Sequence, residues 1–135
     1  MFEIIDAETE VLDSPGEYMN GQQLAYFKGL LERERQAVLS VLHATELPEN
    51  EGAPDWLDQA VVEQDRRTEA MVLDRAHTQL REIDAALHRI EDGSYGYCVD
   101  TGEEIGLARL LARPTASLTV EAQTQREVRE KQRGY

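Results

Sequence analysis

The sequence contains a single cysteine, Cys98, among its 135 residues. One thiol excludes an intramolecular disulfide framework and is typical of proteins from a reducing compartment. It also excludes a four-cysteine metal site, because a structural zinc ion needs about four ligands, mostly Cys or His. The three histidines lie upstream in segments with helical periodicity, and we interpret them as residues of the surface or of the edge of the helix seam: His43, His77 and His88.

Basic residues are also scarce, with 14 Lys and Arg against 27 Asp and Glu and a formal net charge of −13. This excess opposes direct binding to DNA, which relies on cations that neutralise phosphates, and it suits a positively charged partner surface. No stretch approaches the ~20 apolar residues of a membrane span. The first residues lack the basic and apolar pattern of a signal peptide. We therefore expect a cytoplasmic protein without a membrane anchor.

Two long helices are predicted from the periodicity of apolar residues. The first begins after Asn20, which forms a capping-box pattern with Gln23, and ends near the Pro- and Gly-rich stretch 47–54. The second runs from Asp55 to about Glu91. Its apolar residues alternate in steps of three and four, as in a coiled coil: Leu73, Ala76, Leu80, Ile83, Leu87 and Ile90. The short connection makes the two helices antiparallel neighbours.

The predicted fold class is therefore all-α, with a long antiparallel two-helix coiled-coil rod, a small finger-like globular module and a C-terminal helix. We expect a short helix around Glu103–Leu111 and a last helix from about Thr119 to Gln132. The expected domains are a flexible arm (1–17), the coiled coil (18–92, tip near 47–60), the module (93–118) and the C-terminal helix (119–135). The expected apolar residues of the module are Tyr95, Tyr97, Ile105, Leu107, Leu110, Leu111, Leu118 and Val120.

The turn Tyr95–Thr101 has the outline of a zinc knuckle that lacks most of its ligands. Cys98 stands where a Cys-x-x-Cys pair would begin, Thr101 replaces the second thiolate, and Thr119 and Ala122 stand at the spacing of a second pair. We expect no zinc at this site and a module held by packing and hydrogen bonds. For Cys98 itself two interpretations remain, a redox-sensitive thiol or a small buried residue.

Two carboxylates follow the Pro- and Gly-rich stretch, at the predicted tip of the rod. Asp55 and Asp58 are three residues apart, which places both on one face of the first helical turn. They can cap the helix and complement its dipole, or they can act on a partner into which the tip is inserted. Trp56, between them, is either an anchor against that partner or a residue that packs on Leu47.

The order of these motifs resembles the DksA/TraR family of RNA polymerase-binding transcription factors. Asp55-Trp-Leu-Asp58-Gln-Ala60 is similar to the Asp-x-x-Asp-x-Ala tip of that family. The start of the first helix, Glu17–Phe27, and several stretches from Tyr95 to Gln132 also resemble it. The resemblance covers nearly all of the chain beyond the first dozen residues.

The resemblance implies a monomeric protein that binds RNA polymerase through the secondary channel, destabilises promoter open complexes and modulates initiation at rRNA and amino-acid promoters. It implies that Asp55, Asp58 and Ala60 are the tip determinants, with Trp56 beside them. The implied polymerase contacts are Arg75 on the rod and Glu127, Glu130 and Lys131 on the last helix.

Members of the family that respond to ppGpp share a site for it with the polymerase. Arg113 matches a basic position of that site, whereas Glu82 and Gln123 stand where the family has lysines. Because a carboxylate repels a polyanion that a cation attracts, we expect synergy with ppGpp that is weakened or that relies on residues of the polymerase. The alternative function is a coiled-coil interaction module, or a competitor of secondary-channel factors, without its own transcriptional effect. An enzyme is not expected, because no nucleophile–base pair, phosphate loop or ligand cluster is present.

Overall fold

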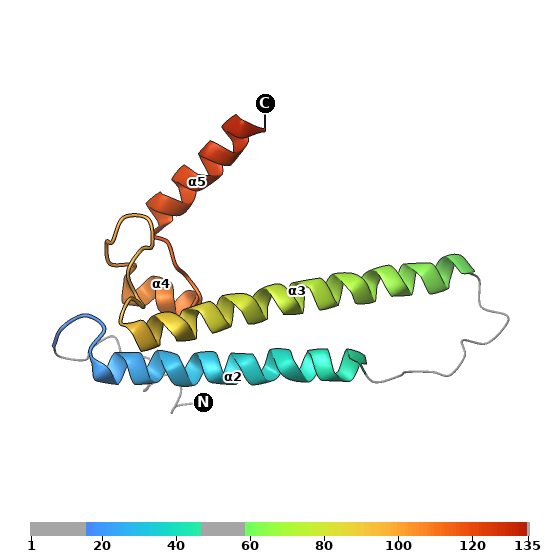
Figure 1. Ribbon diagram of the computed structural model, residues 1–135, viewed down its shortest axis with the longest axis horizontal. Coiled ribbons are helices and arrows are strands. Elements are labelled where there is room, and N and C mark those ends of the chain that lie inside the picture. Colours follow the sequence, from blue (N-terminus) through green and yellow to red (C-terminus); the bar gives the residue numbers. More distant parts are fainter. Residues whose placement is uncertain (1–15, 47–58, 135) are drawn as a thin grey trace. The chain divides into compact units, whose positions relative to one another are not determined.

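The computed structural model describes residues 16–46 and 59–134. Within these ranges the chain forms four α-helices and no strand: α2 (Gly21–Glu46), α3 (Gln59–Asp92), α4 (Leu107–Ala112) and α5 (Val120–Arg133). An isolated antiparallel bridge joins Tyr97 to Glu104. The predicted fold class is thus confirmed, a helical coiled coil with a small finger module (Figure 1). None of the described helices is long and apolar enough to cross a membrane.

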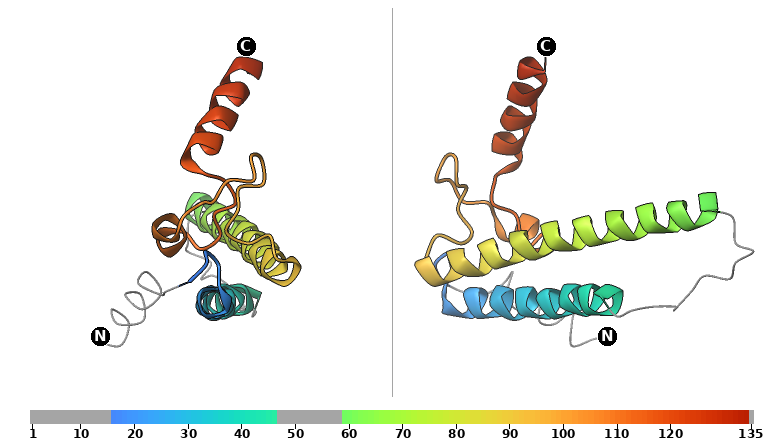
Figure 2. Two further views of the ribbon diagram at one scale, coloured as in Figure 1. Left: turned by 90° about the vertical axis from the view of Figure 1, so that its left-hand side faces the viewer. Right: turned by 45° about the vertical axis from the view of Figure 1, so that its right-hand side comes forward.

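The chain divides into two compact units. The base unit contains residues 16–31 and 85–134 among those described, and the arm unit contains residues 32–46 and 59–84. In each unit a segment of α2 lies beside a segment of α3 that runs in the opposite direction (Figure 2). In addition to its two helix segments, the base unit contains the finger turn (residues 95–103), α4 and α5.

The start of α2 shows why this helix begins where it does. The Gln23 backbone N–H donates to Asn20 Oδ1 at 2.9 Å, and Gln23 Oε1 accepts from the backbone N–H groups of Asn20 at 3.3 Å and Met19 at 2.7 Å. These bonds satisfy donors that the first helical turn leaves without an intrahelical partner. The capping box predicted from the sequence is therefore confirmed, and Gln23 is itself buried.

The core of the base unit lies where α2, the end of α3 and the finger turn meet. Its largest fully buried side chains are Phe27, Leu31, Tyr95 and Leu110. The rings of Phe27 and Tyr95 lie 5.7 Å apart between centroids, and the Tyr95 hydroxyl donates to the Pro114 carbonyl at 2.7 Å. A buried phenol with a satisfied hydroxyl contributes apolar area without an unpaired polar group.

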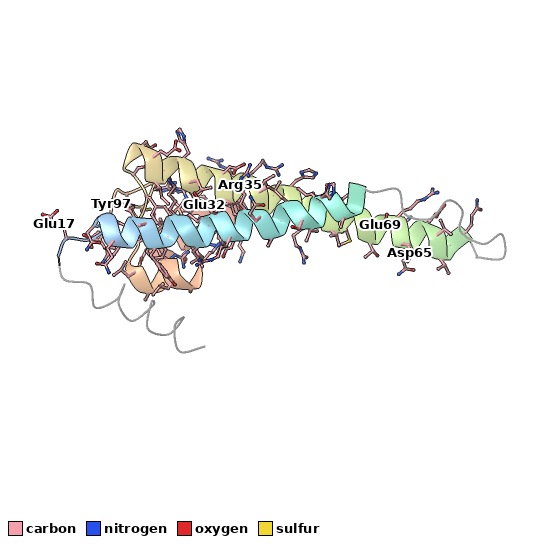
Figure 3. The ribbon with its side chains drawn as sticks, turned by 90° about the horizontal axis from the view of Figure 1, so that it is seen from below. Glu17, Glu32, Arg35, Asp65, Glu69 and Tyr97 are labelled. Carbon is pink, nitrogen blue, oxygen red and sulfur yellow. The ribbon has the colours of Figure 1, made fainter. Side chains whose placement is uncertain are left out.

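The described part of the arm unit buries fewer apolar side chains than the base unit. Three apolar side chains are buried in its described part, Leu42, Ala76 and Ile83. Arg35 on α2 and Asp84 on α3 form an ion pair with a 2.8 Å Nε–Oδ1 distance, and both side chains are partly exposed. Figure 3 shows Arg35 on α2 and the acidic residues Asp65 and Glu69 near the start of α3.

Two predictions about the module are wrong. The short helix begins at Leu107 instead of Glu103, because Glu104 pairs with Tyr97 and Gly106 adopts φ 102°, a left-handed conformation outside the helical range. Val120 is 56% exposed, since it is the first residue of α5 and faces solvent, while Ala122 is buried in its place. Of the other expected core residues, Tyr95 and Leu110 are fully buried, and the rest are half-buried: Tyr97, Ile105, Leu107, Leu111 and Leu118.

Candidate functional site

The finger turn is a tight hairpin-like loop held by backbone hydrogen bonds. The Cys98 N–H donates to the Glu103 carbonyl at 2.7 Å, and the Gly102 N–H donates to the Cys98 carbonyl at 2.8 Å. The Val99 N–H reaches the Ser117 carbonyl at 2.9 Å, which ties the turn to the segment before α5. The turn predicted from Tyr95–Thr101 is therefore present without four thiolates.

The four positions of the incomplete zinc knuckle are partly brought together. Cys98 and Thr119 are buried, and the Thr119 hydroxyl donates to Cys98 Sγ at 3.9 Å. The same Thr119 Oγ1 accepts the Ala122 backbone N–H at 3.1 Å, which makes Thr119 the N-cap of α5. Ala122 is buried, whereas Thr101 is exposed. Hydroxyl and amide hydrogen bonds thus link three of these positions.

The Cys98 thiol has an unusual electrostatic environment. Desolvation by burial raises its pKa, but hydrogen bonds from the Thr101 side chain and from the backbone at Thr119, Thr101 and Asp100 outweigh that effect and lower the pKa to about 7. Donors that converge on a sulfur favour the thiolate. The 3% exposure of Cys98 fits the small buried residue, whereas the lowered pKa fits the redox-sensitive thiol, so both interpretations stay predictions.

These residues do not fit a zinc ion. The four positions offer one thiol, two neutral hydroxyls and a methyl group, and Ala122 has no donor atom. Zinc in structural sites takes four ligands from Cys, His or carboxylates. In the part of the chain that the structure describes, no three His, Cys, Asp or Glu side chains form a group that could hold a metal.

Two arginines connect α5 to the module, and sequence reasoning missed both roles. Arg109 on α4 donates to the Leu118 carbonyl at 3.0 Å and to Gln123 Oε1 at 2.7 Å. Arg126 on α5 donates through Nε to Asp100 Oδ2 at 2.7 Å and through Nη2 to the other carboxylate oxygen. Local sequence patterns do not predict these contacts, because the side-chain partners lie 14 residues from Arg109 and 26 residues from Arg126.

Tyr18, in the segment before α2, connects that segment to the module. Its hydroxyl donates to the Gly96 carbonyl at 2.8 Å and accepts the Gly106 N–H at 2.9 Å. Its ring meets that of Tyr97 edge-on, with centroids 5.6 Å apart. Burial raises the pKa of the Tyr18 phenol, so the neutral hydroxyl that makes both bonds is favoured. Tyr18 therefore fastens the finger turn to the start of the helix pair.

The expected polymerase contacts are all exposed. Arg75 lies on α3 in the arm unit. Glu127, Glu130 and Lys131 lie on α5, where their spacing of three and four residues places them on one face. The histidines are also exposed, as predicted.

The three residues of the expected ppGpp site are not brought together in one unit. Arg113 is exposed and Gln123 is half-buried in the base unit, whereas Glu82 belongs to the arm unit. Gln123 is engaged by Arg109. At the predicted tip, Asp55, Trp56 and Asp58 lie outside the described residues, and Ala60 is exposed in the first turn of α3.

Two family models match the chain in consecutive segments. Residues 23–90 match the N-terminal domain of the DnaK suppressor protein DksA, and residues 93–128 match the prokaryotic dksA/traR C4-type zinc finger. The first match covers α3 almost completely and most of α2. The second contains the finger turn, α4 and the first part of α5.

Curated relatives and solved structures agree with these matches. The chain is 47% identical over 119 residues to the RNA polymerase-binding transcription factor DksA of Caulobacter vibrioides, covering 84% of this chain and 82% of that protein. It is 39% identical over 124 residues to the DksA of Escherichia coli K12, covering 89% and 82%. The solved structure of transcription factor DksA2 from Pseudomonas aeruginosa is similar with a TM-score of 0.74 and 37% identity, covering 92% of this chain and 98% of that one. The chain therefore belongs to the DksA/TraR family.

Proposed function

We propose that this protein binds RNA polymerase and regulates transcription, with its helix pair inserted into the secondary channel of the enzyme. The observation that carries the proposal is the similarity, over 84% of the chain, to a relative named as an RNA polymerase-binding transcription factor. Helices of 26 and 34 residues are about 39 and 51 Å long at 1.5 Å per residue, which suits insertion into a deep channel.

In this proposal the two carboxylates Asp55 and Asp58 act at the tip, with Trp56 and Ala60 beside them. They destabilise promoter open complexes and so change initiation at rRNA and amino-acid promoters. Arg75 on α3 and the exposed residues Glu127, Glu130 and Lys131 on α5 contact the polymerase surface. A net charge of −13 supports recognition of a protein surface over direct DNA binding. We propose no catalytic role, a monomeric state and a cytoplasmic location.

We further propose that the finger works without zinc. The donor set at positions 98, 101, 119 and 122 supports this, because a single thiol remains. Elemental analysis of protein purified with zinc in the medium should give well under one zinc per chain. A chelator should leave the melting temperature and the transcriptional effect unchanged. Stoichiometric zinc, or a chelator-induced fall in melting temperature, would contradict the proposal.

For ppGpp we propose a weakened synergy. Glu82 places a negative charge, and Gln123 no charge, at positions where the resemblance implies lysines. In a transcription assay, ppGpp should enhance inhibition less than it does with a zinc-bearing relative. The variant with Glu82→Lys and Gln123→Lys should recover part of the enhancement. Full enhancement by the wild-type chain would exclude this part of the proposal.

The main test is in vitro transcription from an rRNA promoter with purified polymerase. Asp58→Asn should abolish the transcriptional effect while the Kd for polymerase stays within about twofold, since one carboxylate is a small part of an interface. Asp65→Asn, an exposed acidic residue on α3, is the matched control and should behave as wild type. An undiminished effect of Asp58→Asn would reject the tip mechanism. Displacement of another secondary-channel factor, with no effect of wild type on the promoter, would favour the competitor.

A further inference from the structure

Helix α5 is attached to the rest of the base unit along one narrow face. The attachment residues are Thr119, Ala122, Gln123 and Arg126, at relative positions 0, 3, 4 and 7, which is one side of a helix. The other residues from Thr124 to Gly134 are exposed. Apolar packing on this face is limited to Ala122, the buried residue of α5. A helix with so little buried area depends on its polar contacts for a fixed position.

Of these four attachment residues, Arg126 lies farthest along α5, and it forms an ion pair with Asp100. The guanidinium donates through two nitrogens to both oxygens of the carboxylate, and the exposed fractions are 49% for Arg126 and 31% for Asp100. A bidentate pair fixes direction as well as distance, because two parallel bonds resist rotation of either group. The single hydrogen bond from Thr119 to Cys98 does not fix the direction of α5 in this way.

The same two segments would be joined by the metal in a four-cysteine finger. There the ion bridges a first ligand pair in the turn, here at 98 and 101, to a second pair at the start of the last helix, here at 119 and 122. Asp100 lies between the first two positions, and Arg126 lies about one turn beyond the second two. The ion pair therefore joins the finger turn to α5. The side chains at the four ligand positions cannot make this connection through a metal ion.

We propose that Asp100 and Arg126 are positioning residues, and that their ion pair fixes α5 on the finger turn in the role a zinc ion has in a four-cysteine finger. The inference concerns the free protein and does not depend on polymerase binding. It implies that α5 is held by a contact that responds to salt and to charge.

The charges around the pair support this behaviour. Asp100 faces Arg126 and Arg129 of α5, and Arg126 is also near Cys98 and Glu130. The hydrogen bond from Arg126 is the largest cause of a lowered pKa of Asp100. The carboxylate is therefore ionised at neutral pH, and screening of its charge by salt is what should weaken the anchor.

Amide hydrogen exchange of α5, followed by NMR on the full chain without polymerase, tests the proposal. At low salt, Asp100→Asn and Arg126→Gln should each speed exchange of the amides from Thr124 to Glu130 by about two- to fivefold, the range that exposed ion pairs give. Raising the salt concentration to 1 M should speed exchange in wild type and have little effect in Asp100→Asn. The charge-swapped variant Asp100→Arg with Arg126→Asp should recover part of the protection and of the salt response.

Two control variants remove neighbouring charges without touching the pair, Glu103→Gln in the turn and Arg133→Gln at the end of α5. Both should keep the wild-type exchange rates and salt dependence. The proposal is overturned if Asp100→Asn exchanges like Glu103→Gln, if its salt dependence equals that of wild type, or if wild-type α5 already exchanges as an unstructured peptide. A transcription defect in Asp58→Asn would be unaffected by any of these outcomes, so the two proposals fail separately.

Discussion

The base unit and the arm unit share the same two helices but are stabilised in different ways. The base unit buries the aromatic rings of Phe27 and Tyr95 and adds side-chain hydrogen bonds such as those of Tyr18 and Arg109. The described part of the arm unit buries three smaller side chains, and Val61, Met71 and Val72 are exposed. The larger buried side chains therefore concentrate global stability in the base unit, and the arm unit leaves several apolar side chains exposed.

The largest effect should come from the base core. Phe27→Ala should lower the free energy of unfolding by about 3–5 kcal/mol, because it removes a fully buried ring, whereas Leu42→Ala in the arm unit should cost about 2–3 kcal/mol. Val41→Ala, half-exposed beside Leu42, is the control and should cost about 0.5 kcal/mol. Urea denaturation followed by circular dichroism measures all three. Equal costs for Phe27→Ala and Leu42→Ala would contradict a more stable core in the base unit.

A second prediction concerns the close approach of the finger turn to the segment before α2. Gly96 has φ 91°, and a Cβ there would lie 2.6 Å from Met19 Cγ. Gly96→Ala should therefore cost about 2–4 kcal/mol, from left-handed strain and overpacking together. Gly93 has φ 84° with no atom within 4 Å of such a Cβ, so Gly93→Ala isolates the strain at about 1–2 kcal/mol. If thermal denaturation gives both variants the same loss, the contact with Met19 is unimportant.

Tyr18→Phe should cost about 1–3 kcal/mol, because the Gly96 carbonyl and the Gly106 N–H lose their partner. The variant also has a pH signature. Burial raises the folded-state pKa of Tyr18 above its unfolded value near 10, so its contribution is complete below about pH 10 and is lost as pH rises through the folded pKa. Wild type should thus lose more stability than Tyr18→Phe above about pH 10. Parallel alkaline unfolding curves for the two proteins would contradict this role.

The smallest effect is expected for the ion pair of the arm unit. Arg35→Gln should cost less than about 1 kcal/mol, because both partners are partly exposed, with 37% and 49% of their side-chain area accessible. A double-mutant cycle with Asp84→Asn measures the coupling, which should shrink further at high salt. A coupling above about 2 kcal/mol would show that the arm unit relies on this pair for its stability.

Local patterns in the sequence predicted much of the helical frame. The capping box at Asn20 and Gln23 depends on residues three apart, and the structure confirms it. The apolar spacing of the second helix correctly included Ala76 and Ile83, which are buried. The same spacing missed Ala86, which is fully buried although it lies outside the alternating apolar series.

The module was harder to predict, because its contacts join residues distant in sequence. The start of α4 depends on the left-handed Gly106, and the burial of Ala122 in preference to Val120 depends on how the Thr119 cap rotates α5. The partners of Tyr18 lie 78 and 88 residues away. The motif at the finger turn did locate the site, but the hydrogen bonds that replace the missing ligands required the fold.

The base unit is assembled from both ends of the described chain, residues 16–31 and 85–134. During synthesis on a ribosome, Tyr18 and Phe27 therefore emerge long before Tyr95, Gly106 and Leu110 exist to receive them. The arm unit comes from the middle of the chain, and its helices can pair first. Since contacts between residues distant in sequence form slowly, the buried side chains of early α2 can be covered only after the end of the chain has been translated.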